Sequence, residues 1–554
     1  MDRIRPVVSR LLLDAAARDR LPIIFLAIVV FAFFLPSLVT PEVLIWPHSG
    51  LGSDISYRHW PDLIGYARSW RAGRVPVWGS GVALGRPLAG DPTVLFLYPF
   101  DIVFAWIPPA LAFNILNALH VFLAGLFTYL FLRVGYKTSR PAALVSAFAF
   151  AFAPKFISHL AGGHVGLVWG VAWAPAVLFG LKLAFDGWLL GAALGGLALA
   201  VQMPTHLQMP YYTAGVASAY WAWHLAPSLW RALRGRRDEW RQVRRLALCY
   251  LVWLGAFALL AAAVLLPLLE LLPYNGRSNF TLADANLFAL PPLLLVTLLV
   301  PSNFQFPEWT MFVGLIPLAL AALAWRGRRH WPWPFFALLA FCALIFSLGA
   351  STPFFALANA LIPGLGMLRV PTRIWFFGGL AVAVLAGFGA DLLSQDGARE
   401  WLLRRSKRLV IMTATYMTGS LLAWLGYWVM FRRWHEPMSL RLVTAALVIL
   451  VGGLWLGGRL SGRAVQWALV LLLLLDLLPL DSAFIDLADP RTTFLKSTPA
   501  LDYVSAQAGI FRVYSVAGDL PYAVAAAHGV ETLEGLLAFQ VGYAGKAIRV
   551  ATGC

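Results

Sequence analysis

Long apolar runs recur along almost the whole chain, and they constrain its fold more than any other feature of the sequence. A helix of about 20 apolar residues is long enough to cross the hydrocarbon core of a membrane. The sequence therefore predicts an all-α polytopic membrane protein with about thirteen transmembrane helices. We expect these spans near residues 21–40, 110–132, 141–158, 165–184, 188–202, 208–225, 246–269, 309–325, 333–349, 373–393, 409–430, 441–458 and 464–480. The run at 287–300 has two prolines near its start, which favours a re-entrant segment.

The composition agrees with a membrane protein and excludes several other classes. Of the 554 residues, 60% are hydrophobic and 12% are charged, which leaves too little polar surface for a soluble domain of this size. The net charge of +17 comes from short basic clusters between apolar runs, a pattern typical of cytoplasmic loops. The three cysteines form neither a metal-binding spacing nor a disulfide framework. We therefore expect membrane lipids, and no nucleic acid, among the partners.

The basic clusters also predict the orientation of the spans. With the N-terminus inside, the dense clusters at 230–245 and 326–329 fall on the cytoplasmic side, as the positive-inside rule requires. Arg432, Arg433 and Arg441 are exceptions to this pattern. The protein is thus expected in the plasma (inner) membrane, with its active face extracytoplasmic.

Two outer segments follow from this orientation: the first loop, 41–109, and the C-terminal stretch, 481–554. Alternating β-branched residues at 511–516 and 541–550 predict short strands in the C-terminal stretch. We expect this stretch to be a small outer α/β or β domain, incomplete in this sequence, that follows a transmembrane domain of residues 1–480.

The first outer loop carries an amphipathic helix and a candidate catalytic carboxylate. Apolar residues repeat at helical spacing from Trp60 to Trp70, with Asp62 off the stripe, which predicts a helix lying in the membrane interface. Asp54 precedes it and is either a helix cap or a general base for an acceptor hydroxyl. Asp62 is expected to be solvated, and Asp91 either starts a turn or shares the chemistry.

Further polar residues gather at the predicted outer face. His159 and His164 form a His-x4-His pair, a weak signal for zinc; no metal ligand is assigned, and a divalent metal stays an open alternative. Arg369 and Arg373 either hold a lipid phosphate through forked hydrogen bonds or contact lipid headgroups. The predicted catalytic residues are Asp54, Asp91 and Glu270, and the predicted substrate-binding residues are His59, Asp62, His159, His164, His206, Arg369 and Arg373.

Four segments of the chain match a known family in order. They are SDISYRHWPD with GRVPVWGSGVALGRPLAGDP and FLYPF, PEWTMFVGLIPLALAAL, LGASTPFFALANALIPGLGMLRVPTRIWFF with LAGFGADLL, and FRVYSVAGDLPYAVAAAHGVETLEGLLAFQVGY. In this order they resemble the bacterial YfhO-type membrane proteins, which belong to the wider GT-C glycosyltransferase-like group. The resemblance implies an enzyme that moves a sugar from a polyprenyl-phosphate carrier to a lipid or cell-wall glycan acceptor. It also implies that Asp54 is the catalytic base or positions the acceptor, although the following ISYRHWP matches the family pattern only in part.

Three functions remain open on the sequence. A glycosyltransferase would use the carboxylate in the first loop, and Trp60, Trp70 and Trp78 could stack on sugar faces or anchor the loop in the interface. A transporter or flippase of a lipid-linked component would place ionisable residues at mid-membrane, and almost none is found there. A non-catalytic envelope assembly protein would keep the topology without the chemistry. The sequence favours the glycosyltransferase.

Overall fold

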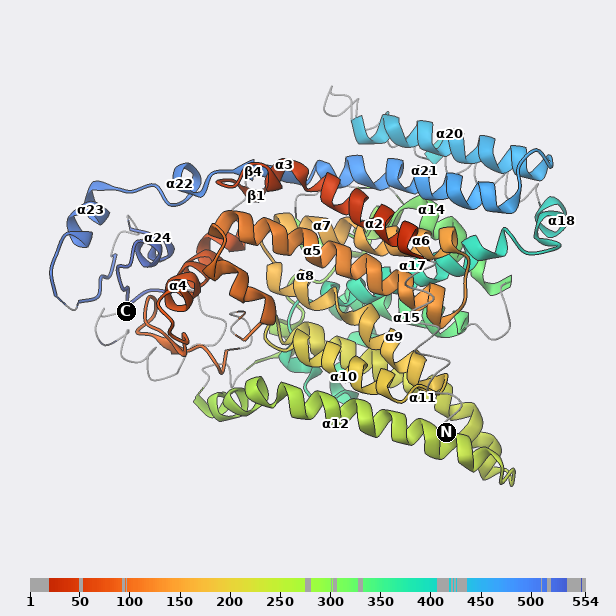
Figure 1. Ribbon diagram of the computed structural model, residues 1–554, viewed down its shortest axis with the longest axis horizontal. Coiled ribbons are helices and arrows are strands. Elements are labelled where there is room, and N and C mark those ends of the chain that lie inside the picture. The colour runs from red at the N-terminus through yellow and green to blue at the C-terminus, as the bar shows by residue number, and fades with distance from the viewer. Residues whose placement is uncertain are drawn as a thin grey trace.

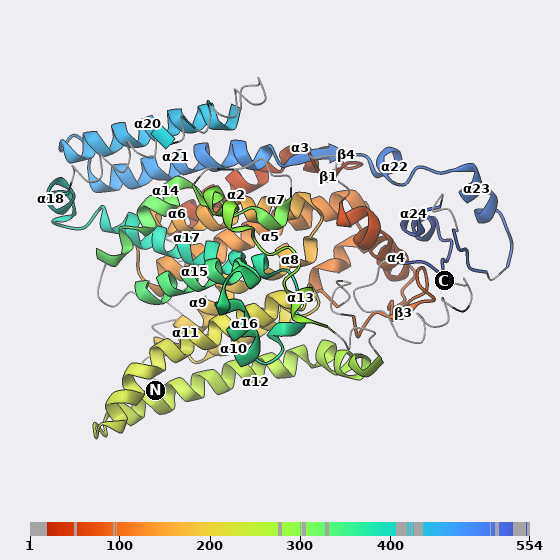
Figure 2. The ribbon, with the colours of Figure 1, turned by 180° about the vertical axis from the view of Figure 1, so that it is seen from behind.

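The computed structural model describes residues 19–48, 53–91, 97–274, 280–299, 306–326, 332–405, 436–509, 511–515 and 520–535, with the short pieces 95, 301, 418–419, 422, 425 and 550. Its long helices lie side by side along the long axis of the molecule, and a smaller part extends beyond one end of them (Figures 1 and 2). The described strands form two sheets of two strands each. The bundle is therefore helical, as the apolar runs predict.

The bundle is built from helices of very different length. In chain order they are α2 (Arg20–Phe33), α3 (Leu35–Leu38), α5 (Pro109–Leu130), α6 (Arg140–Ala151), α7 (Pro154–Ala161), α8 (Val165–Val171), α9 (Ala174–Phe185), α10 (Leu190–Gln202), α11 (Gln208–Leu233), α12 (Glu239–Leu271), α13 (Leu282–Ala285), α14 (Leu315–Ala321), α15 (Trp333–Ser347), α16 (Pro353–Leu361), α17 (Trp375–Leu392), α18 (Ala398–Leu403), α20 (Glu436–Leu456) and α21 (Gly462–Ser482). Helix α17 is buried along its whole length, as its apolar residues on every side require. Helix α12 keeps much of its apolar surface exposed, as a lipid-facing helix does.

Hydropathy located most of these helices but missed their breaks. Within the described residues, six helical segments are long and apolar enough to cross a membrane, and they coincide with predicted spans; the segments are Pro109–Gly135, Arg140–Ala161, Val165–Phe185, Glu239–Tyr274, Pro371–Leu392 and Gly462–Ser482. Helix α7 begins at Pro154, which interrupts the predicted span at 141–158, because proline lacks the N–H that continues a helix. The run at 287–300 forms a short 3-10 helix, Pro292–Leu298, and does not span. The predicted span at 409–430 lies almost wholly outside the described residues, and the total of thirteen stays a prediction.

One end of the bundle, which we call the loop end, joins the first loop to the C-terminal stretch (Figure 1). Strand β1 (Leu44–Pro47) pairs antiparallel with β4 (Ile485–Ala488), and His48 Nδ1 lies 3.1 Å from Asp486 Oδ2 beside this pair. Helices α22 (Pro490–Thr493), α23 (Pro499–Ser505) and α24 (Tyr522–Ala527) follow. The hairpin between α11 and α12, with its many arginines, lies at the opposite end of the bundle.

The first of the two strands predicted in the C-terminal stretch, at 511–516, does not form, and the second stays a prediction. Residues 511–515 form one isolated bridge, Val513 to Thr532, and no named strand. The strand that the structure does show, β4, is only four residues long and is specified by its pairing with β1. Residues 541–549 of the second predicted strand lie outside the described residues.

The amphipathic helix of the first loop is confirmed. A π-helical turn, Ile55–His59, leads directly into α4 (Trp60–Arg71). The apolar stripe of α4 is buried through Trp60, Leu63, Tyr66 and Ala67. This face packs against the 3-10 helix Pro99–Ala105 and against α24, so the helix is held by the protein itself. The continuous helical segment 55–71 contributes lining residues to the two cavities described below.

Candidate active site

Asp54 lies at the start of the helical segment 55–71 and contacts the turn between α7 and α8. Its backbone N–H donates to Gly162 O at 3.1 Å. Gly163 has a φ of +81°, and a Cβ there would lie 2.4 Å from Ser53 Oγ, so only glycine permits this approach. His164 follows the turn, and its Nε2 lies 3.4 Å from Asp54 Oδ2. The first loop and the Gly-Gly turn thus bring the predicted residues Asp54 and His164 together.

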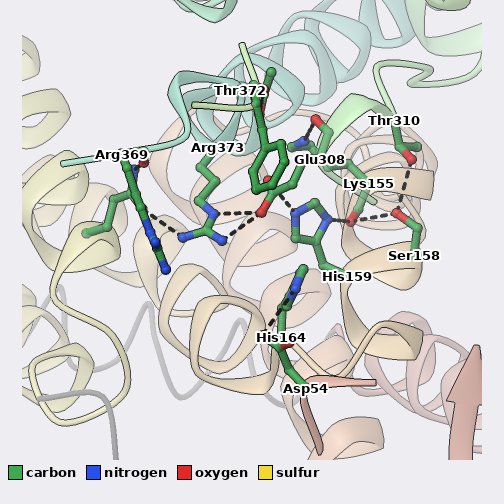
Figure 3. A network of polar contacts seen from close by, with 12 residues as sticks. Asp54, Lys155, Ser158, His159, His164, Glu308, Thr310, Arg369, Thr372 and Arg373 are labelled. Atoms are coloured by element: carbon green, nitrogen blue, oxygen red, sulfur yellow. Dashed lines mark hydrogen bonds and ion pairs between the residues drawn. The ribbon is translucent and has the colours of Figure 1, made fainter. Parts of the chain in front are cut away.

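Glu308 is the centre of a polar network next to this pair (Figure 3). Arg373 donates to Glu308 Oε1 through Nε at 2.9 Å and Nη2 at 2.7 Å. His159 Nε2 lies 3.1 Å from Glu308 Oε2, and Lys155 Nζ donates to the main-chain oxygen of Glu308 at 2.9 Å. The side chain of Glu308 is 2% exposed. Glu308 therefore joins α7 to the 3-10 turn Pro371–Ile374 before α17, through its carboxylate to His159 and Arg373 and through its main-chain oxygen to Lys155.

The environment fixes the protonation of the groups outside the spans. Burial raises the pKa of Glu308, but the attraction of Arg373 and His159 outweighs it and holds that pKa well below its usual value. Burial lowers the pKa of His164, although the Asp54 carboxylate opposes this shift. Glu308 is therefore ionised at neutral pH, and His164 presents a neutral ring to Asp54.

A cavity of about 560 Å³ opens beside this network; we call it the arginine pocket. Among the described residues its polar wall is formed by Asp54, Arg58, His59, His164, His206, Gln208, Arg369 and Arg373. The rest of the lining is largely apolar and comes from the end of α12 and from the segments around Phe280 and Met367. An amphipathic cavity with excess arginine suits an anionic head on an apolar tail.

The two arginines predicted from sequence are positioned by one amide. Gln208 Nε2 donates to Arg369 O at 2.8 Å, and Arg373 Nη1 donates to Gln208 Oε1 at 3.2 Å. Val370, between the arginines, has a φ of +65°, a conformation that a β-branched residue rarely adopts. Gln208, which is buried, holds this unusual turn in place.

The same residues could hold a divalent metal. His159, His164 and Glu308 offer ligand atoms that lie within 4.8 Å of one another, and two imidazoles with one carboxylate are a donor set that suits zinc. The Nδ1 atom of His159 faces Lys155 O at 2.9 Å, which turns Nε2 towards Glu308, as an outer-shell partner does for a ligating histidine. Arg373 competes for the same carboxylate. A metal held there would stabilise negative charge on a phosphate.

The structure does not bring all predicted residues to this pocket. Asp91 is buried, and its Oδ2 atom lies 3.4 Å from Arg86 Nη1. Arg86 Nη2 lies 2.5 Å from Asp62 Oδ2, so Asp62 is not the solvated residue that the sequence predicts. These carboxylates belong to a separate group around Arg86. Glu270 is exposed on α12 and is not among the lining residues. Asp91 and Glu270 are therefore separated from the Asp54 network.

Four residues of the site were missed from sequence: Arg58, Lys155, Gln208 and Glu308. Lys155 is a single cation in the apolar run FAFAPKFISHLA, which is a signal for a functional group near the membrane. Glu308 is a single carboxylate between apolar segments, and Arg58 is one turn after Asp54. Two of the three guanidinium nitrogens of Arg58, Nε and Nη2, are buried without a hydrogen-bond partner in the described structure.

Comparison with known proteins gives a fold and no sequence family. No family model matches the chain, and no curated sequence matches it. Among solved structures, ArnT from Cupriavidus metallidurans bound to undecaprenyl phosphate has a TM-score of 0.50 at 13% identity, over 95% of this chain and 87% of that one. The arabinofuranosyltransferase AftD from Mycobacteria has a TM-score of 0.42 at 18% identity, over 65% of this chain and 25% of that one.

The Archaeoglobus fulgidus oligosaccharyltransferase has a TM-score of 0.47 at 13% identity, over 94% of this chain and 65% of that one. This chain thus spans a quarter of the length of the AftD chain. The likeness to ArnT extends over nearly the whole of both chains. The chain therefore shares its overall helical fold with ArnT.

Proposed function

We propose that this chain is a YfhO-type membrane glycosyltransferase, which moves a sugar from a polyprenyl-phosphate carrier to an envelope acceptor on the extracytoplasmic face. The observation that carries the proposal is the arginine pocket, in which Asp54 and the arginines share one wall of an otherwise apolar cavity. ArnT, whose fold the chain shares, has been solved with undecaprenyl phosphate. A lipid phosphate is the ligand chemistry that suits this pocket.

The polar wall suits binding of the donor. Arg58 and Arg369 line the pocket beside Arg373, and guanidinium groups bind phosphate oxygens through paired N–H groups. The apolar lining around Leu268, Leu272 and Met367 gives a place for the first isoprene units. No nucleotide is needed, because the phosphate–sugar bond of the donor supplies the free energy of transfer.

The chemistry follows from the position of Asp54. The acceptor oxygen attacks the anomeric carbon and forms the new glycosidic bond, while its proton passes to the Asp54 carboxylate. The bond from the anomeric carbon to the phosphate oxygen breaks, and its electron pair leaves with the lipid phosphate. Arg58, Arg369 and Arg373 stabilise the charge that grows on this leaving group. His164 orients the carboxylate from 3.4 Å away.

The test is sugar transfer by the purified chain in liposomes. The donor is a radiolabelled polyprenyl-phosphate sugar and the acceptor an envelope extract, with Asp54→Asn compared against wild type and against Glu270→Gln, an exposed carboxylate outside the pocket. We expect Asp54→Asn to lower the transfer rate by about 10²–10⁴-fold and Glu270→Gln to leave it unchanged.

Binding of undecaprenyl phosphate, measured on the same preparations, shows whether Asp54→Asn is folded. Equal transfer by wild type and Asp54→Asn would remove Asp54 from the mechanism. Absence of transfer with every donor, while lipid phosphate still binds, would favour a transporter or an assembly protein instead.

A further inference from the structure

A second cavity lies further along the same helical segment; we call it the tryptophan pocket. Its volume is about 290 Å³, and its walls come from α4, from the strands Trp78–Gly79 and Arg86–Pro87, and from the segment after α24. The arginine pocket takes Asp54, Arg58 and His59 from the start of the segment, and the tryptophan pocket takes Asp62 and Arg68 from further along it. None of the described residues lines both cavities.

Acidic and basic side chains pair with one another in and around the wall of the tryptophan pocket. Arg86 is 4% exposed and donates to Asp62 Oδ2 at 2.5 Å and to Asp91 Oδ2 at 3.4 Å. Glu531, on the opposite wall, pairs with Arg512 at 2.8 Å. Paired carboxylates and guanidinium groups offer fixed acceptors and donors side by side, without the excess positive charge of the arginine pocket.

A flat aromatic surface stands beside these polar groups. The side chain of Trp78 is 56% exposed and lies against Gly85, where a Cβ would be 2.5 Å from the indole Nε1 atom. Gly85 has a φ of +89°. Glycine is required there because other residues rarely adopt this backbone conformation and because a Cβ would clash with the indole. The loop is therefore shaped to seat Trp78 at the pocket.

The C-terminal stretch closes the pocket on its other side. Arg68 Nη2 donates to Ala527 O at 2.8 Å, Thr532 N–H donates to Gly81 O at 3.1 Å, and Ala83 N–H donates to Glu534 O at 3.1 Å. These bonds join segments more than 440 residues apart in the sequence. The pocket exists only because the first loop and the C-terminal stretch fold together.

We propose that the tryptophan pocket binds a neutral glycan, which makes the acceptor of the proposed transfer an oligosaccharide or a glycan chain. Sugar hydroxyls both donate and accept hydrogen bonds, so they can bind the carboxylates and the guanidinium groups of this pocket alike. The apolar face of a sugar ring packs on an indole. Asp54 and Asp62 are eight residues apart, about 12 Å along a helix, so a bound oligosaccharide of a few units reaches the proposed base. The identification of this glycan as the acceptor rests on the proposed function, but glycan binding itself is tested without any sugar transfer.

The experiment measures binding of soluble oligosaccharides to the full chain. The chain is placed in nanodiscs free of sugar-based detergent, and neutral tri- to pentasaccharides of hexoses and pentoses are titrated by calorimetry. We expect at least one to bind, and Trp78→Ala to weaken it about tenfold. Trp106→Ala is the matched control, because Trp106 is 77% exposed on the same loop and does not line the pocket. Trp78→Phe, which keeps an aromatic face, should retain part of the affinity.

Two results would overturn the inference: no binding of any oligosaccharide at millimolar concentration, or equal binding by wild type and Trp78→Ala. Stronger binding of anionic than of neutral oligosaccharides would also contradict it. Undecaprenyl phosphate binding is followed in parallel. A chain that binds the lipid phosphate and transfers sugar but binds no free oligosaccharide would refute this inference and leave the proposed function standing.

Discussion

The arginine pocket and the tryptophan pocket are both built around an arginine–carboxylate pair, and they differ in the residues that surround this pair. Each has an arginine paired with a carboxylate, and one partner of each pair is buried: Glu308, which pairs with Arg373, and Arg86, which pairs with Asp62. In the arginine pocket, further arginines and an apolar lining accompany the pair. In the tryptophan pocket, a second carboxylate and an exposed indole accompany it.

The difference shows how one helical segment can contribute to two sites of different chemistry along its length. A buried ion pair by itself contributes little net stability, but it holds its side chains rigidly, and its loss is costly. The excess of arginine then suits an anion, whereas the balanced pairs suit neutral hydroxyl groups. If this comparison is right, substitutions in one pocket should leave ligand binding in the other intact.

The largest effect is expected from Arg373→Met. This change leaves Glu308 buried without its guanidinium partner, and breaking such a pair costs about 3–5 kcal/mol. We expect a marked fall in the unfolding temperature and loss of undecaprenyl phosphate binding, measured by thermal unfolding and by lipid titration.

Arg369→Met is the matched control for this prediction, because Arg369 lines the same pocket but its side chain is exposed. It should weaken lipid phosphate binding and leave the unfolding temperature close to that of wild type. Similar losses of stability in both variants would contradict the proposed difference, in which Arg373 stabilises the fold of the pocket and Arg369 binds the ligand. Loss of oligosaccharide binding in Arg369→Met would break the separation of the two pockets.

The sequence predicted the parts of the site whose signal is local. The stripe from Trp60 to Trp70 shows the helical period directly, and α4 has the predicted position. Asp54 and Arg373 were identified because each stands beside an apolar span in a polar segment. Residues whose role depends on a distant contact gave no such signal: Glu308 meets Arg373 across 65 residues and His159 across 149.

The fold shows the same limit. Hydropathy measures apolar length, so it found the spans but not the break at Pro154. It also gave no sign of β4, since four residues carry too little alternation to predict a strand. The tryptophan pocket could not be predicted at all, because Trp78 and Glu531 come from opposite ends of the chain and meet only in the folded protein.

A second, smaller effect concerns the pH dependence of the free energy of unfolding, through His59 of the arginine pocket. Burial first, and then the charges of Arg58, His164 and Arg86, lower the pKa of His59 well below its ordinary value. The unfolded chain therefore binds a proton at His59 at a higher pH than the folded chain does. The stabilising contribution is complete above about pH 6.5 and is lost as the pH falls below it, by about 1.4 kcal/mol per unit until the folded pKa is reached.

The measurement is the free energy of unfolding of wild type and His59→Gln between pH 7 and pH 5. We expect the wild-type value to fall more steeply than that of His59→Gln as the pH falls below about 6.5. Parallel curves would show that His59 is not held neutral. His59 does not line the tryptophan pocket, so oligosaccharide binding by folded His59→Gln should equal that of folded wild type at each pH.

The smallest effect, and the most specific, is expected from Gln208→Leu. Leucine keeps the bulk of the buried side chain but neither donates to Arg369 O nor accepts from Arg373. Loss of these bonds should cost about 1 kcal/mol, and donor binding should weaken roughly fivefold because both arginines lose their fixed positions. Gln202→Leu removes another buried amide, one bonded to Thr213, and controls for the general effect of such a change.

The kinetic signature separates positioning from folding. A purely structural role for Gln208 would lower the fraction of active enzyme and leave the KM for the donor unchanged, whereas displaced arginines should raise that KM. Gln208→Glu sharpens the result, because a carboxylate still accepts from Arg373 and cannot donate to Arg369 O. We expect it to recover part of the donor affinity if Arg373 is the more important contact. Failure of both variants to alter the KM would show that the strained turn at Val370 holds the arginines without Gln208.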